Sequence, residues 1–197
     1  MRLSNSKIKD LVINYFPNLE EEVIDLFLSI TQYKSANNKE LILEIGKPNN
    51  ILVFILKGVA KAYNTNEDGK ELNNYIRAEG HLMGDAKIFG NEALTLNIKA
   101  IGEMHYLKID MIEFENLGYE NPKLMKFYLS LLKEIILRLS YRLNTFVTMT
   151  PEERYLDLIK SNPILIETAF DKDIASFLGI TPLTIHRIKK VITKPMK

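Results

Sequence analysis

The spacing of apolar residues changes twice along this chain of 197 residues. Residues 1–30 repeat apolar side chains at steps of three and four, which is typical of amphipathic helices. Residues 41–109 instead hold short runs rich in β-branched and aromatic residues, and helical spacing returns after residue 121. A β-rich centre between helical ends predicts an α+β fold built on an antiparallel sandwich or barrel.

Turn residues indicate where the first helices and the strands begin and end. Pro17 divides the helical start into two helices. In the segment Asn66-Glu67-Asp68-Gly69-Lys70, Gly69 can take the positive φ angle of a tight hairpin turn. The expected strands are Leu41–Ile45, Ile51–Leu56, Val59–Tyr63, Leu72–Ile76, Leu94–Ala100 and His105–Ile109.

A long helix is expected from Asn121 to about Val147. Asn121 is a good N-cap, and Pro122 suits the first helical position, where its missing N–H is not needed. One apolar row, which can lie on the chain's own β domain, consists of Leu124, Phe127 and Leu131. A second row has the spacing of a coiled-coil seam and predicts a homodimer, with a helix buried inside one monomer as the alternative. This second row consists of Met125, Tyr128, Leu132, Ile135, Leu139, Leu143 and Phe146.

A capping box marks the start of the next helix. Thr150 is its predicted N-cap, Pro151 its first residue and Glu153 its third. A new N-cap so soon after the long helix implies a change of direction, and therefore a hinge. We expect three parts: a β-rich domain over residues 1–118, a dimerisation helix over 119–149 and a C-terminal domain over 150–197.

Residues 171–191 have the pattern of a helix-turn-helix motif. Two short helical patterns are joined by Leu178-Gly179-Ile180. The steep packing of two such helices requires a small residue where they approach and a conformationally permissive residue in the turn, and Ala175 and Gly179 occupy these positions. The shared core is predicted to consist of Ile174, Leu178, Ile180, Ile185 and Ile188.

The second helix of this motif is expected to read the major groove of DNA. Thr181 is its predicted N-cap and Pro182 its first residue. Arg187 is the predicted base-contacting residue, because arginine can donate two hydrogen bonds to one guanine. His186 is expected to donate to a base edge or a phosphate. Contacts that hold the DNA backbone are expected from Thr181, Thr184, Lys189 and Lys190.

Charge is distributed in a way that agrees with a DNA-binding C-terminus. The whole chain has a net charge of only +1. Residues 181–197 nevertheless contain five basic side chains and no acidic one. A basic end on an otherwise balanced chain is expected of a segment that meets phosphate, and a solvated lysine-rich tail is the alternative.

Composition excludes several kinds of site. The chain has no cysteine, so it cannot form a disulfide, a thiolate zinc site or a cysteine-ligated iron–sulfur cluster. It has no nucleophile motif, P-loop or dinucleotide fingerprint, and its histidines, His81, His105 and His186, are far apart in sequence. We therefore expect no enzyme, no metal site and no resident cofactor. A haem-bound sensor with one axial histidine and a protein-interaction module without specific DNA binding remain alternatives.

The chain also lacks the signals of export and membrane insertion. No apolar stretch approaches the length of a membrane span. Residues 1–10 are charged and polar where a signal peptide needs an apolar core. The expected location is therefore the cytoplasm, with no membrane partner.

Five short segments and the long helix together carry a resemblance to a known family. The segments are Val53–Gly58, Glu67–Glu71, Gly80–Asp85, Pro151–Leu156 and Ile174–Thr181. In order and spacing they resemble the Crp/Fnr family of transcription regulators. The resemblance implies a cyclic-nucleotide-binding-like β-roll, a central dimerisation helix and a winged helix-turn-helix, with Arg187 at the family's most regular base-contacting position. It implies as partners a second copy of the chain, double-stranded DNA with a near-palindromic site, and RNA polymerase.

The β-roll departs from the family's cyclic-nucleotide sensors, which carry a Gly-Glu pair for the ribose and an arginine for the phosphate. Here the glycine precedes an aspartate, and no arginine stands in the segment that matches the phosphate clamp. A buried phosphate without a cationic partner is costly, so cyclic AMP is not expected by this route. Lys87 or Lys99 is the alternative cation. The expected effector pocket, for an unknown ligand, consists of Gly84, Asp85, Leu94, Thr95 and Leu96.

The DNA-reading segment departs from the family as well. Pro182 and Leu183 stand where polar or acidic residues are common. The resemblance therefore implies DNA binding without implying the operator sequence. Six residues follow Val191, which leaves little chain for a wing.

Overall fold

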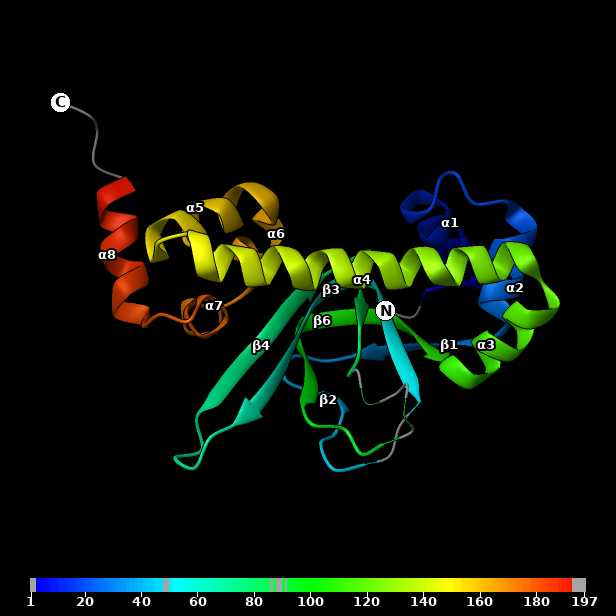
Figure 1. Ribbon diagram of the computed structural model, residues 1–197, viewed down its shortest axis with the longest axis horizontal. Helices are drawn as coiled ribbons and strands as arrows, with labels where there is room; N and C mark the ends of the chain where they lie inside the picture. Colours follow the sequence, from blue (N-terminus) through cyan, green and yellow to red (C-terminus); the bar gives the residue numbers. More distant parts are fainter. Residues whose placement is uncertain (1–2, 48–49, 86, 88–89, 91, 193–197) are drawn as a thin grey trace.

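The computed structural model describes residues 3–47, 50–85, 87, 90 and 92–192. Its strands form one antiparallel sheet in the order β1-β6-β3-β4, with β2 paired to β6 and β5 paired to β3. Helices gather at the two ends of this β-roll, and α4 runs along it from one end to the other (Figure 1). The predicted α+β fold is confirmed. The strands are β1 Thr31–Ala36, β2 Leu41–Leu43, β3 Ile51–Thr65, β4 Glu71–Ala78, β5 Leu82–Met83 and β6 Asn97–Asp110.

Several predicted strand boundaries were wrong, and one strand was missed. The runs 51–56 and 59–63 belong to the single strand β3, because Gly58 takes a φ of +95° at an irregularity in the ladder with β6 and does not end the strand. The predicted strands 94–100 and 105–109 belong likewise to the single strand β6, but residues 94–96 lie outside any strand because β6 begins at Asn97. Strand β1 was not predicted, because its sequence TQYKSA is mostly polar and buries only Ala36.

The first hydrophobic core lies between the roll and the helices at one end of the molecule. These helices are α1 Asn5–Tyr15, α2 Glu21–Ser29, α3 Met111–Glu120 and the first half of α4 Pro122–Thr148. Phe27 is fully buried, with its ring centroid 5.3 Å from that of Phe127 and 5.7 Å from that of Phe114. The row Leu124, Phe127 and Leu131 is buried here, as predicted. Helix α3 was not predicted.

The C-terminal helices pack on the other end of the roll. They are α5 Pro151–Ser161, α6 Pro163–Thr168, α7 Asp171–Leu178 and α8 Pro182–Ile192. The predicted caps are confirmed: Asn121 accepts from Lys123 and Leu124, and the capping box of Thr150 and Glu153 is complete. A second core joins these helices to the sheet residues Val59, Ile76, Ala78 and Ile101. The C-terminal domain therefore rests directly on the β-roll.

Among the helices of the described residues, none combines the length and the apolar character that crossing a membrane requires.

Gly58 allows a close crossing of β3 and β6 that another residue would prevent. A Cβ atom at Gly58 would lie 2.6 Å from the carbonyl oxygen of Glu103. Gly46 is a matched control, since its φ of +81° is equally unusual but its Cβ would meet nothing within 4 Å. We expect Gly46→Ala to lower the free energy of unfolding by about 1–2 kcal/mol through backbone strain alone. Gly58→Ala should cost about 1–3 kcal/mol more, because of steric overlap. Equal losses in denaturant titrations would contradict this explanation.

Candidate nucleic-acid interface and ligand cavity

Helices α7 and α8 form the predicted helix-turn-helix. Gly179 takes a left-handed φ of 68° between them, and the Ile180 N–H donates to the Ala175 carbonyl at 2.9 Å. Ile185 and Ile188 on α8 are buried against α7. The opposite face of α8 is consequently left to solvent. The remaining members of the predicted core are Ile174 and Leu178, which are buried, and Ile180, which is partly buried.

The six residues predicted to contact DNA all lie on or beside α8, but they are not equally available. The hydroxyl of Thr181 accepts from the Thr184 N–H at 3.1 Å and pairs with the Thr184 hydroxyl at 2.9 Å, so both threonines take part in the helix cap. Lys189 forms an ion pair with Asp171 of α7, at 2.6 Å. His186, Arg187 and Lys190 are exposed, and no described residue forms a hydrogen bond or an ion pair with their side chains. Lys194 and Lys197 of the basic end lie outside the described residues.

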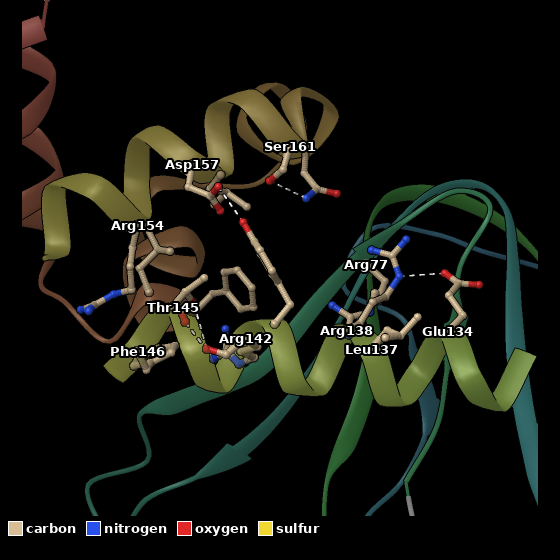
Figure 2. Close-up of a pocket in the computed structure, with 15 residues that line it drawn as sticks. Arg77, Glu134, Leu137, Arg138, Arg142, Thr145, Phe146, Arg154, Asp157 and Ser161 are labelled. Atoms are coloured by element: carbon tan, nitrogen blue, oxygen red, sulfur yellow. Dashed lines mark hydrogen bonds and ion pairs between the residues drawn. The ribbon is translucent and has the colours of Figure 1, made fainter. Parts of the chain in front are cut away.

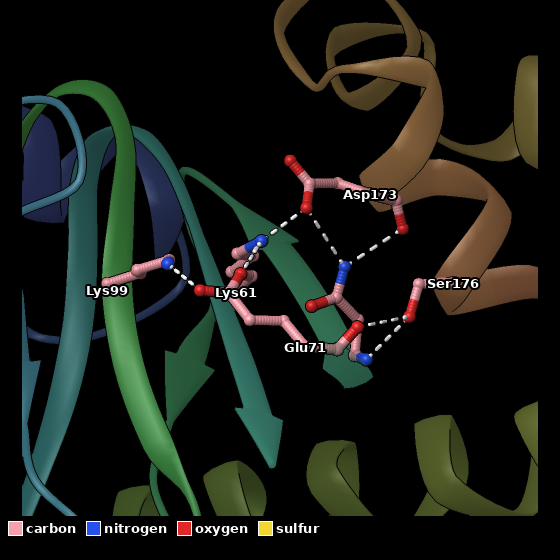
Figure 3. Close-up of polar contacts among 6 residues, drawn as sticks. Lys61, Glu71, Lys99, Asp173 and Ser176 are labelled. Atoms are coloured by element: carbon pink, nitrogen blue, oxygen red, sulfur yellow. Dashed lines mark hydrogen bonds and ion pairs between the residues drawn. The ribbon is translucent and has the colours of Figure 1, made fainter. Parts of the chain in front are cut away.

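A buried polar network fixes α7 to the β-roll (Figure 3). The Lys61 ammonium on β3 contacts the Asp173 carboxylate on α7 and, at 2.7 Å, the Glu71 carboxylate. The Asn73 side-chain amide donates to the Asp173 carbonyl at 3.0 Å. The Asn73 N–H donates to the Ser176 hydroxyl at 2.8 Å. Helix α8 is therefore positioned through α7 by residues of β3 and β4.

Both charges of the central pair are removed from water. Lys61 is 3% exposed and Asp173 is 5% exposed. Burial by itself would raise the pKa of Glu71, but hydrogen bonds from Lys61 and Lys99 outweigh this and hold the pKa below its usual value. Charged groups are rarely buried unless they are paired, so each member of this network depends on the others. The only sequence signal was a lysine within the apolar run of β3.

A cavity of about 800 Å³ lies between the β-roll and α4. Its wall is mostly apolar, with Leu82 and Met83 on the roll and Leu132 and Ile135 on α4. Gly84, Asp85 and Leu96 of the expected effector pocket line this cavity. Leu94 and Thr95 do not, and Leu94 is instead buried in the first core.

Asp85 has its carboxylate oxygens occupied within the β-roll. It accepts from the Thr95 N–H at 2.6 Å, the Thr95 hydroxyl at 2.7 Å and the Lys87 N–H at 3.1 Å. These bonds join the two segments that the sequence placed in one pocket. The alternative cations are engaged as well, Lys87 with Glu92 at 2.7 Å and Lys99 with Glu71. Asp85 therefore serves to hold a loop in this arrangement.

Three arginines that were not predicted as pocket residues line the cavity. They are Arg77 on β4 and Arg138 and Arg142 on α4. His81 lines it too, and its Nδ1 atom lies 2.8 Å from the Glu79 carbonyl oxygen. Within the described part of the chain, no group of three histidine or carboxylate side chains could hold a metal ion.

The predicted seam residues on α4 divide into two groups. Tyr128 is only 7% exposed and donates its hydroxyl to Glu115 at 2.7 Å, so it faces its own domain. Met125, Leu132 and Ile135 are partly buried and pack against the first core. Leu139, Leu143 and Phe146 are exposed, and so are five residues of α4 that were not predicted: Leu129, Ile136, Leu137, Tyr141 and Val147.

Comparisons with known proteins agree with this architecture. Residues 33–121 match the cyclic nucleotide-binding domain family. No curated protein sequence matches the chain. The fold is similar to that of the c-di-GMP responsive global regulator CLP from Xanthomonas campestris, with 14% identity, a TM-score of 0.67, and coverage of 88% of this chain and 91% of that one.

Two further solved structures share the fold. FixK2 from Bradyrhizobium japonicum has 14% identity and a TM-score of 0.68, over 83% of this chain and 84% of that one. The catabolite activator protein of Thermus thermophilus has 17% identity and a TM-score of 0.54, over 90% of this chain and 85% of that one. At these identities the likeness establishes the fold.

Two aspartates on α7 provide a test of the buried network. Asp173→Ala would leave the buried ammonium of Lys61 paired with Glu71 alone, which we expect to destabilise the docked α7 by about 3 kcal/mol, the lower end of the range for a broken buried ion pair. Asp171→Ala is the matched control, because it removes the same charge from the same helix turn at an exposed ion pair and should cost at most about 1 kcal/mol. Native-state hydrogen exchange of the α7 amides measures both values. Equal protection in the two variants would mean that the buried pair contributes no more than a surface pair.

Proposed function

We propose that this chain, which has the fold of the Crp/Fnr-type regulators and a cyclic nucleotide-binding domain over residues 33–121, is a sequence-specific DNA-binding transcription regulator. The observation that carries the proposal is the outer face of α8. Arg187, His186 and Lys190 are exposed there, while Ile185 and Ile188 hold the inner face on α7. This division of faces is what a recognition helix in a major groove requires.

We assign the contacts on this face by their chemistry. Arg187 donates to the O6 and N7 atoms of a guanine, and His186 donates to a base edge or a phosphate. Lys190 holds the phosphate backbone. The capping hydroxyls of Thr181 and Thr184 lie at the helix start, where they bind a phosphate. Lys189 lies in the last turn of α8 and contacts the DNA backbone there by exchanging its ion pair with Asp171 for a phosphate.

The exposed part of α4 supports a homodimer, with a revised seam. Four predicted seam residues face the chain's own domain and leave the seam, namely Met125, Tyr128, Leu132 and Ile135, and the exposed Leu129 and Ile136 join it. The revised seam recurs at steps of seven, three and four and consists of Leu129, Ile136, Leu139, Leu143 and Phe146. Such a heptad pattern fits a parallel pair of α4 helices. The pair would hold two recognition helices for half-sites about one helical turn apart in a near-palindromic operator.

The cavity between the β-roll and α4 supports control by a small molecule. Ile136 and Leu139 belong both to the cavity wall and to the revised seam, so a second copy would cover the cavity mouth. A ligand there alters DNA binding if it favours one arrangement of the α4 pair over another. Cyclic AMP held by the family's usual phosphate clamp is not favoured, because residues 94–96 provide no arginine and the oxygens of Asp85 are occupied.

Selection of binding sites from random duplex DNA tests the recognition helix. We expect a near-palindrome for the unmodified protein, and a loss of about 1–3 kcal/mol with relaxed preference at one base pair for Arg187→Ala. Lys34→Ala removes an exposed positive charge from β1, remote from α8, and should keep the full sequence preference. A salt series separates specific from electrostatic binding. An unchanged preference in Arg187→Ala would contradict the assignment.

Charges placed in the seam test the dimer. Ile136 and Leu143 are 64% and 68% exposed, so the double variant Ile136→Asp and Leu143→Asp should leave each monomer folded. We expect sedimentation equilibrium to give a monomer with greatly weakened operator binding, because each monomer offers one half-site contact. The matched control, Ile112→Asp on α3, also places a charge at an exposed isoleucine and should remain a dimer. Tight palindrome binding by a proven monomer would refute the scheme.

A further inference from the structure

Four side chains form a wall shared by two cavities. They are Arg77 of β4 and Glu134, Arg138 and Arg142 of α4. On one side lies the 800 Å³ cavity under α4, and on the other lies a cavity of about 530 Å³ beside α5 and α7. Figure 2 shows these residues along α4 and the neighbouring strand, with Arg154 on α5 across the smaller cavity. The shared wall thus contains three guanidinium groups and one carboxylate.

That carboxylate is engaged by only one of the three arginines. Glu134 accepts from the Arg138 Nε atom at 2.7 Å. Within the described part of the chain, neither Arg77 nor Arg142 forms an ion pair with a carboxylate. Arg77 donates to the Ile76 carbonyl and lies over the Tyr75 ring, 5.1 Å from its centroid. A partly buried guanidinium satisfied only by a carbonyl and a ring retains donors that an anion can use.

Arg142, like Arg77, lies over aromatic rings and donates to a backbone carbonyl, and it is closer to α8. Its guanidinium carbon lies 4.1 Å from the ring centroid of Phe177 and 4.8 Å from that of Phe146. Burial, together with the nearby charges of Arg77 and Arg154, lowers the pKa of Arg142 to about 10. The positive charge at this wall is therefore crowded and partly desolvated. A bound anion would relieve both conditions.

We propose that Arg77 and Arg142 bind the anionic group of an otherwise apolar organic ligand whose body fills the 800 Å³ cavity. A volume of this size is typical of small-molecule sites, and apolar walls with a few polar groups are their usual lining. Arginine binds a carboxylate or a phosphate through two parallel hydrogen bonds. The cavity includes part of the expected pocket, but its positive charges come from β4 and α4 and not from Lys87 or Lys99.

Arg142 connects the ligand site with the helix-turn-helix formed by α7 and α8. Arg142 donates to the Phe177 carbonyl at 2.9 Å, in the last turn of α7. Phe146, one turn later on α4, packs beside Gly179, where an added Cβ would lie 3.0 Å from its ring. An anion on Arg142 competes with the Phe177 carbonyl for the guanidinium and so acts on the turn between α7 and α8. In this role the ligand is the effector of the regulator proposed above, and this coupling rests on that proposal.

Isothermal titration of the full chain with four probes tests the ligand class. The probes are octanoate, octyl phosphate, octan-1-ol and inorganic phosphate. We expect at least one octyl anion to bind about tenfold or more tightly than both octan-1-ol and inorganic phosphate, because both the charge and the apolar body contribute. The two octyl anions distinguish a carboxylate from a phosphate group. DNA binding is measured separately on ligand-free protein, so failure of either proposal is visible on its own.

Substitutions at the wall locate the binding site. Arg77→Met and Arg142→Met should each bring the affinity for the octyl anion down to that for octan-1-ol, whereas Lys133→Met, at an exposed position of α4, should leave it unchanged. Thermal unfolding shows which variants fold. Arg142→Lys keeps the positive charge but loses the paired donors, so it should bind the octyl anion with intermediate affinity. The proposal is overturned if neither octyl anion binds the unmodified protein, if octan-1-ol or inorganic phosphate binds equally well, or if the preference persists in both methionine variants.

Discussion

The buried ion pair between Lys61 and Asp173 determines where the C-terminal domain lies. It joins residues 112 positions apart in the chain, and its partners Glu71 and Asn73 come from the next strand. Apolar contacts alone could form in several orientations, because the hydrophobic effect has no direction. A buried charge accepts few geometries, since every unmet donor or acceptor is costly. The orientation of α8 relative to the β-roll therefore depends on this network.

Helix α4 provides the other constraint on the architecture. With 27 residues it is about 40 Å long, which is enough to pass both hydrophobic cores. Its first turns pack in the first core, its middle turns line the cavity, and its last turns contact α7. One outer stripe remains free for a second copy. A single helix thus touches the cavity, the proposed dimer seam and α7, which is the arrangement that the proposed control of DNA binding requires.

The positive charges that line the cavity lie on β4 and α4, and not in the loop segment of the β-roll where the sequence predicted the effector pocket. In the β-roll, the carboxylate of Asp85 is bound to Thr95 and the Lys87 backbone. The positive charges that face the cavity come from Arg77 and from α4. A ligand group bound there would lie against the helix and not deep in the roll. This placement favours ligands that act directly on α4.

The sequence by itself determined those features that form between near neighbours in the chain. The caps at Asn121, Thr150 and Thr181 and the left-handed turn at Gly179 need only residues a few positions away, so local pattern was sufficient. The exposed face of α8 followed in the same way from helical periodicity. Strand β1 was not predicted, because a polar edge strand has too few apolar residues to show the alternating pattern.

Only the tertiary structure decided which distant side chains meet. It placed Tyr128 in the core rather than the seam, merged two runs into β3, and brought Arg77 beside Arg142 and Lys61 against Asp173. No local rule couples such positions, because their spacing in the sequence bears no relation to their distance in the fold. Local hydrogen bonds thus fix the helices and turns, whereas the cavity and the domain interface arise from packing between them.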